Sequence, residues 1–184
     1  NFEFVKGRLK ARYNMSSPQA AVRYFEKMYA DMPTNENKYA YISALQTNGE
    51  TDRALDEMNE VLKKFPKNLI LNITKSEILL SGQRLNEAQE NIDQVLNIAP
   101  GNYPASIIKS KILSSKKEFI KAEEILRDLL ISKNRDPGLW IQLSDVQRAG
   151  KNIVGYHLSR GEYYTLIGDF DNALNQFQFA LSLS

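Results

Sequence analysis

The sequence predicts an all-α fold, a right-handed superhelix of about eleven helices arranged as repeated antiparallel pairs. Three observations predict it. Small and apolar residues recur about every 34 positions, proline follows the second helix of a pair at nearly the same interval, and capping residues bound the helical segments. No segment has the alternating apolar pattern of a half-buried strand.

The repeat is clearest at alanine. Ala54, Ala88 and Ala122 are 34 residues apart, and apolar residues follow each of them four and seven positions later. A small side chain lets the second helix approach its neighbour closely, and the two apolar positions lie on the same helical face. This layout is typical of the tetratricopeptide repeat (TPR). The other members of the series are Met58, Ile92 and Leu126, then Val61, Val95 and Leu129, then Pro33, Pro66 and Pro100, with Ala21, Phe25 and Met28 one period before.

Capping residues place the ends of the helices in order along the chain. Ser17 before Pro18 is typical of a helix start, and Asn48-Gly49 of a helix end. Asn68, Asn86 and Asn102 are interpreted as caps or turn residues. We expect helices at residues 2–13, 17–31, 35–48, 51–65, 68–81, 85–98, 103–115, 118–131, 137–149, 152–167 and 170–183. They form repeats 1–33, 34–66, 67–100, 101–135 and an irregular 136–184 within a single domain, 1–184.

The C-terminal part departs from the regular register. Ala173 lies 51 residues after Ala122, which is one repeat and a half, so the helix that carries Trp140 is inserted. We expect the helix from about residue 152 to pack on both of its neighbours; alternatively, the superhelix kinks there. The last segment matches the TPR pattern best, at Gly161, Tyr164, Gly168, Ala173, Phe177 and Ala180.

Composition excludes several classes of chemistry. The 184-residue chain has no cysteine and one histidine, so it has no disulfide, no cysteine nucleophile and no two-histidine zinc motif of its own. Its 24 basic and 22 acidic residues give a net charge of +2, which gives no reason to expect nucleic acid or an anionic membrane as partner. No stretch has the ~18 apolar residues of a membrane span, and no phosphate-binding glycine motif is present.

Most residues that could suggest a site have a simpler interpretation. His157 and Ser159 are two positions apart, so they point to different faces of a helix and do not predict a catalytic pair. Trp140 and Tyr164 are interpreted as packing residues, whereas Tyr156 and Tyr163 either pack or line a pocket for an aromatic side chain of a peptide, as the sequence leaves both open. The lysines at 109, 111, 116, 117 and 121 are interpreted as a solvated face. The basic residues of the first helix, Lys6, Arg8, Lys10 and Arg12, either are solvated or dock on another domain.

Two stretches resemble a known family. They are FVKGRLKARYN at residues 4–14 and DPGLWIQLSDVQRAGKNIVGYHLSRGEYYTLIGDFDNALNQF at residues 136–177. Together they resemble the C-terminal TPR region of the periplasmic β-barrel assembly-enhancing proteases, which are HExxH zinc metalloproteases with a TPR tail. No position in this chain matches HExxH, so no metal ligand or catalytic residue carries over to it.

The resemblance implies a periplasmic location and a zinc endopeptidase domain N-terminal to Asn1. It implies protein or peptide partners, among them outer-membrane proteins, their assembly machinery and the chain's own protease domain. Zinc would belong to that domain, and this chain would hold no cofactor and have no catalytic activity. The alternative is a free-standing TPR scaffold or chaperone adaptor without a protease.

The concave face of a TPR stack is where a partner is expected, and the first helix of each repeat lines it. That face lacks the cluster of basic and amide residues that clamps a terminal carboxylate, so we expect recognition through isolated apolar anchors with weak salt dependence. Tyr39 and Ile73 are the expected anchors. The predicted face comprises Lys6, Lys10, Tyr39, Ser43, Gln46, Ile73, Glu77, Ile107, Lys111, Ile141 and Asp145.

Overall fold

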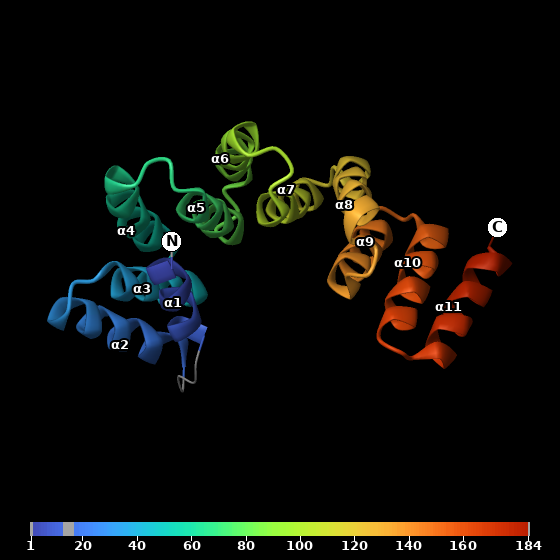
Figure 1. The fold of residues 1–184 in the computed structure, drawn as a ribbon, viewed down its shortest axis with the longest axis horizontal. Helices are drawn as coiled ribbons and strands as arrows, with labels where there is room; N and C mark the ends of the chain where they lie inside the picture. The colour runs from blue at the N-terminus through green and yellow to red at the C-terminus, as the bar shows by residue number, and fades with distance from the viewer. Residues whose placement is uncertain (1, 13–16, 184) are drawn as a thin grey trace. The chain divides into compact units, whose positions relative to one another are not determined.

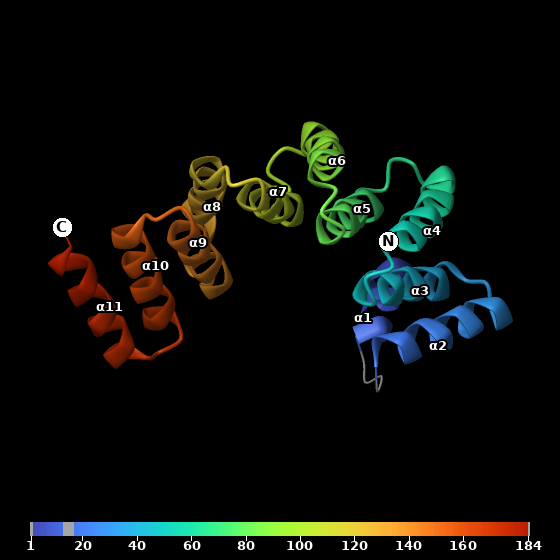
Figure 2. The ribbon, with the colours of Figure 1, turned by 180° about the vertical axis from the view of Figure 1, so that it is seen from behind.

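The computed structural model describes residues 2–12 and 17–183, and within them the protein is entirely helical, with eleven helices and no strand (Figures 1 and 2). Every predicted helix is present, and its ends lie within two residues of the predicted ones wherever they fall in the described ranges. The helices are α1 (Phe2–Arg12), α2 (Pro18–Asp31), α3 (Asn35–Thr47), α4 (Thr51–Lys64), α5 (Leu69–Ser81), α6 (Leu85–Ile98), α7 (Tyr103–Ser115), α8 (Phe119–Lys133), α9 (Pro137–Ala149), α10 (Ile153–Leu166) and α11 (Phe170–Ser182).

Side-chain caps explain where several helices begin. The Ser17 hydroxyl accepts a hydrogen bond from the Ala20 amide, and Asn68 and Asn102 cap α5 and α7 in the same way. Such caps satisfy amides that have no partner inside the helix. Asn86 is different, because it lies in the first turn of α6 and not at a cap or in a turn.

The turns inside the helix pairs keep the 34-residue period. Gly49, Gln83, Lys117 and Lys151 all have positive φ angles, of 79°, 60°, 64° and 62°. Each directly follows the residue that caps the first helix of its pair, where a left-handed residue reverses the chain. The turn between α10 and α11 uses Gly168, at 81°.

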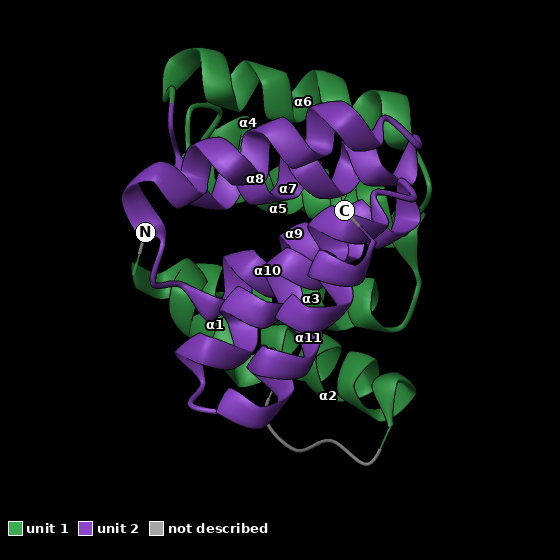
Figure 3. Cartoon of the chain, turned by 90° about the vertical axis from the view of Figure 1, so that its right-hand side faces the viewer, with its two compact units in different colours: residues 1–100 green, residues 101–184 purple. Residues whose placement is uncertain are grey.

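The chain divides into two compact units, residues 1–100 and 101–184, coloured separately in Figure 3. The division falls at the predicted repeat boundary after Pro100. In the first unit α1 and α2 both pack on α3, and the order then continues as α3 on α4, α4 on α5 and α5 on α6. The repeat residues Ala54, Met58, Ala88 and Ile92 are buried in this unit, as the period predicts.

In the second unit each helix from α7 to α11 packs on the next. Ala122 and Leu126 of α8 are buried in a cluster with Leu139 and Leu143 of α9, and Trp140 packs against that cluster half-buried. The prediction for α10 is confirmed, because it packs on both α9 and α11. It therefore serves as second helix to α9 and first helix to α11, which accounts for the half repeat.

Candidate protein-binding groove

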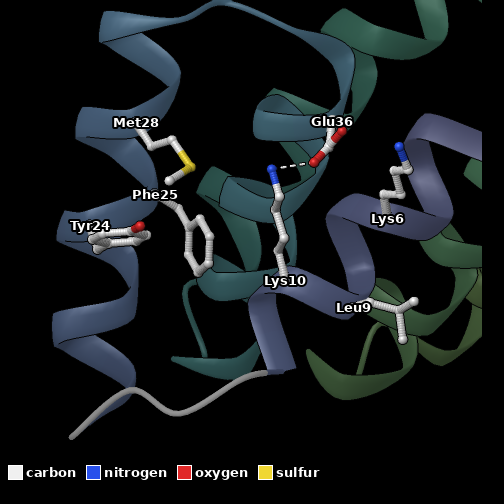
Figure 4. Close-up of a pocket in the computed structure, with 7 residues that line it drawn as sticks. All are labelled: Lys6, Leu9, Lys10, Tyr24, Phe25, Met28 and Glu36. Carbon is white, nitrogen blue, oxygen red and sulfur yellow. Dashed lines mark ion pairs between the residues drawn. The ribbon is translucent and has the colours of Figure 1, made fainter.

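The first unit carries an open groove between α1 and α2, with a volume of about 610 Å³. That size is within the range of ligand pockets, roughly 300–1,000 Å³. Figure 4 shows Phe25 and Met28 pointing from α2 toward Lys10 of α1, whose ammonium group pairs with Glu36 of α3. The lining residues are Lys6, Leu9 and Lys10 from α1, Tyr24, Phe25 and Met28 from α2, and Glu36 from α3.

The groove exists because α1 packs on α3 and not closely on α2. Gly7 faces α3, where a β-carbon on it would lie 2.4 Å from the carbonyl oxygen of Glu36. Phe4 is buried, and its ring lies tilted against that of Tyr39 and edge-to-face with that of Phe65, with centroids 5.7 and 5.8 Å away. The close approach to α3 thus fixes α1 at a distance from α2.

The groove is apolar inside and charged at its edge. Phe25 is buried at the bottom and Met28 is half-buried, whereas Leu9 and Tyr24 are both about half exposed. Lys10 is held by Glu36, but Lys6 has no carboxylate partner among the described residues, and its Nζ lies 4.5 Å from the ring centroid of Phe2. An apolar cleft with a few charged groups at its rim suits an amphipathic protein segment.

The structure corrects two of the predicted binding residues. Tyr39 and Ile73 are only 1% and 7% exposed, so they are packing residues and not exposed anchors. The Tyr39 hydroxyl makes a short hydrogen bond with the Thr74 hydroxyl, at 2.5 Å, and burial raises the pKa of the Tyr39 phenol. The projection from the repeat period fails at Tyr39 because its ring packs beside Phe4 of α1 and its hydroxyl bonds to Thr74 of α5.

The other predicted positions lie at the surface or close to it. Lys6, Lys10, Lys111 and Asp145 are exposed, and Ser43, Gln46, Glu77, Ile107 and Ile141 are half-buried. Only Lys6 and Lys10 are brought to the groove, while Ile107 packs against the core of the second unit. Their part in binding a partner stays a prediction.

The basic residues of α1 are engaged to different degrees. The Arg8 guanidinium donates to the Glu77 carboxylate of α5 at 2.9 Å, which ties α1 to the third helix pair. Lys10 pairs with Glu36, and Lys6 remains over Phe2. Arg8 and Lys10 therefore have partners within the first unit, whereas Lys6 lines the groove without a carboxylate partner among the side chains that the structure describes.

Sequence reasoning did not identify Tyr24, Phe25 and Met28 as groove residues, because Phe25 and Met28 occupy repeat positions that face the core. A usable signal was present in α1. Phe4 lies on one face of that helix, while Phe2, Val5 and Leu9 lie on another and are exposed. A helix with apolar residues on two faces is expected to be covered on both sides.

Other polar clusters in the described residues are structural. The Ser159 hydroxyl donates to Gln147 at 2.7 Å, and Gln147 donates to Glu123 at 3.0 Å, which links α10, α9 and α8. His157 is half-buried, with Nδ1 2.8 Å from the Gln176 side-chain oxygen. Within residues 2–12 and 17–183, no group of three or more acidic or histidine side chains is placed to hold a metal ion.

Solved structures with the same arrangement of helices are TPR proteins. A TPR protein from Parabacteroides merdae matches over 90% of this chain and 72% of its own, with 18% identity and a TM-score of 0.63. The thermophilic TPR protein TTC0263 of Thermus thermophilus matches over 89% and 90%, with 16% identity and a TM-score of 0.69. MamA from Desulfovibrio magneticus matches over 100% and 96%, with 18% identity and a TM-score of 0.52.

No protein-family model and no curated protein sequence matches the chain. The likeness to the solved structures, together with the 34-residue period and the helix pairs, defines the fold as that of the tetratricopeptide repeat. None of the helices in the described ranges is long and apolar enough to cross a membrane.

Proposed function

We propose that this chain is a protein-binding TPR module and that the groove between α1 and α2 receives an apolar segment of its partner. The observation that carries the proposal is the apolar lining of this groove, in which Leu9 and Tyr24 are about half exposed above the buried Phe25. Exposed apolar clefts with a polar rim mark interaction sites in soluble proteins.

The chemistry of the lining defines the preferred segment. Leu9 and Tyr24 offer partly exposed apolar surface above Phe25, which suits a segment with two or three apolar side chains on one face. Lys6 at the rim favours an acidic residue beside them. Apolar burial provides most of the affinity, so salt should weaken binding only slightly.

A finer proposal follows from the sequence resemblance. The module would be the C-terminal tail of a periplasmic zinc endopeptidase and would position outer-membrane proteins or dock their assembly machinery. What supports this is the likeness of residues 4–14 and 136–177 to that family. Zinc and catalysis would belong to the protease domain. The second candidate is a scaffold or adaptor without a protease.

Peptide arrays test the binding function directly. The probe is a set of immobilised 15-residue peptides in which apolar content and net charge vary independently, with affinities then measured by fluorescence polarisation. We expect peptides with several apolar residues and an acidic residue to bind. Leu9→Asp or Tyr24→Ala should weaken them by about tenfold or more, equivalent to about 1.4 kcal/mol.

Ile120→Asp is the matched control, because Ile120 is an exposed apolar residue of α8 outside the groove. It should bind the same peptides as the unchanged chain does. Equal binding by the groove variants and the control would overturn the assignment of the groove.

The finer proposal has a separate test, which is translation of the gene upstream of the Asn1 codon. An HExxH motif in the same reading frame supports the protease parent, and its absence favours the scaffold or adaptor.

A further inference from the structure

The last helix, α11, exposes a continuous apolar face. Phe170, Leu174 and Leu181 are 68%, 59% and 78% exposed, and their spacing of four and seven places them on one side of the helix. The opposite side is closed, because Ala173 and Ala180 are buried toward α10. Within the described residues this apolar face is left uncovered, and an exposed apolar patch of this kind is typical of a binding surface.

Interior helices show what normally covers this face. Aligned on the repeat alanines, Leu174 corresponds to Leu55 of α4, and Leu181 corresponds to Leu130 of α8. Leu55 is 5% exposed where α5 packs on α4, and Leu130 is 7% exposed in the cluster that includes Leu139 of α9. The α11 face therefore has the composition of a surface that receives another helix or a helix-lined groove.

The groove between α1 and α2 is complementary to that face in polarity and charge. Its lining is apolar, and α1 carries four basic residues and one acidic residue. The segment 169–183 has no basic residue and carries Asp169 and Asp171 beside its exposed apolar positions. Asp171 is exposed, and Lys6 has no carboxylate partner among the described residues, so each offers a charge to the other.

We propose that α11 of one copy of this chain binds in the α1–α2 groove of a second copy. The inference rests on the proposed protein-binding function of the groove and names its occupant. Phe170, Leu174 and Leu181 contact the apolar lining, and Asp171 pairs with Lys6. Because two different surfaces meet, the contact is head-to-tail, and a pair of copies leaves one groove on one copy and one α11 on the other free for further copies.

Sedimentation velocity of the 184-residue chain, over a wide range of concentration, tests the association. We expect the average mass to rise with concentration beyond a dimer. Leu174→Asp on α11 and Leu9→Asp in the groove should each weaken association by about tenfold or more. Ile120→Asp should associate as the unchanged chain does, and circular dichroism checks that all variants remain folded.

Mixing the two disrupted variants distinguishes a head-to-tail contact from a symmetric one. Leu174→Asp retains an intact groove, and Leu9→Asp retains an intact α11, so their mixture should form a one-to-one dimer and grow no further. A mixture that stays monomeric would overturn the proposal, as would a chain that is monomeric at every concentration.

Charge exchange tests the pairing of Lys6 with Asp171. Lys6→Glu and Asp171→Lys should each weaken association, and their mixture should recover it; no recovery would remove this pair from the contact. If the chain does not self-associate but the Leu9→Asp variant still loses binding of the array peptides, self-association fails while the binding function stands. If both are lost, the groove itself has been assigned wrongly.

Discussion

The first and last helix pairs differ in whether their two helices pack on each other. In the last pair, α10 and α11 pack directly on each other, and α10 also packs on α9. In the first pair, α1 and α2 both pack on α3 and leave a groove of about 610 Å³ between them. The same two-helix unit is therefore closed at one end of the chain and open at the other.

One glycine in each pair, and the neighbour that it faces, accounts for much of this difference. Gly161 of α10 faces its own pair partner, and a β-carbon there would lie 2.4 Å from the Phe177 ring of α11. Gly7 of α1 faces α3 instead, against the Glu36 carbonyl. The neighbouring helix that the glycine faces can approach closely, because glycine has no β-carbon. A repeat can therefore keep its period and still open a binding groove.

An overpacked interior alanine should give the largest effect and set the reference for both ends. Ala122→Leu places three extra carbons between α7 and α9, and we expect a loss of about 3 kcal/mol in the free energy of unfolding. Ala173→Leu should cost less, because among the described helices α11 packs closely on α10 alone. Chemical denaturation measures both. Equal losses, or none at Ala122, would show that the assigned repeat register does not describe the packing.

A methyl group on Gly7 should push α1 away from α3. In Gly7→Ala the new carbon meets the backbone of α3, which cannot rotate away, so α1 must move outward at a cost of about 2 kcal/mol. We expect faster amide hydrogen exchange in α1 than in the unchanged chain, with α5 and α6 unaffected. Unchanged protection of α1 would mean that Gly7 does not set its distance from α3.

Gly161→Ala in the last pair should destabilise the protein less than Gly7→Ala does, and a second substitution should recover part of the loss. Gly161→Ala meets the end of the Phe177 side chain, which can adjust, so we expect a loss of about 1 kcal/mol. Adding Phe177→Leu removes the obstructing ring atoms and should recover part of the loss. Thermal unfolding of the single and double variants measures this. A purely additive double variant would contradict the contact.

The turns should give the smallest effect. Lys151 holds a positive φ of 62° between α9 and α10, where Gly168 holds 81° between α10 and α11. A residue with a side chain costs about 1–2 kcal/mol at positive φ. Glycine avoids this cost, but it loses more conformational entropy on folding, so the net gain in stability is smaller. We expect Lys151→Gly to stabilise by about 0.5 kcal/mol and Gly168→Ala to destabilise by about 1 kcal/mol, in the same denaturation assay. Destabilisation by Lys151→Gly would reverse the expected sign.

The helices and their order were predictable because they depend on local signals. The 34-residue period placed Ala54, Ala88 and Ala122 at buried positions, and caps such as Ser17 and Asn102 placed helix starts. The half repeat before Ala173 predicted that α10 packs on two neighbours. Each of these follows from spacing along the chain, which the helical geometry converts directly into a face.

The binding surface was not predictable in the same way. Tyr39 and Ile73 were expected as exposed anchors by projecting one repeat onto the next, yet both are buried. Lys6 and Lys10 are exposed, but the residues that line the groove with them, such as Tyr24 and Met28, come from another helix.

The sequence by itself determined the repeat, the helix boundaries and the buried alanines, because these depend on residues within one or two turns of each other. Only the tertiary structure decided that α1 packs on α3 and not on α2, and that the outer face of α11 is left uncovered within the described residues. Both outcomes depend on the distance between helices, which is set by the side chains of two or three elements together, such as Gly7 against Glu36 or Gly161 against Phe177.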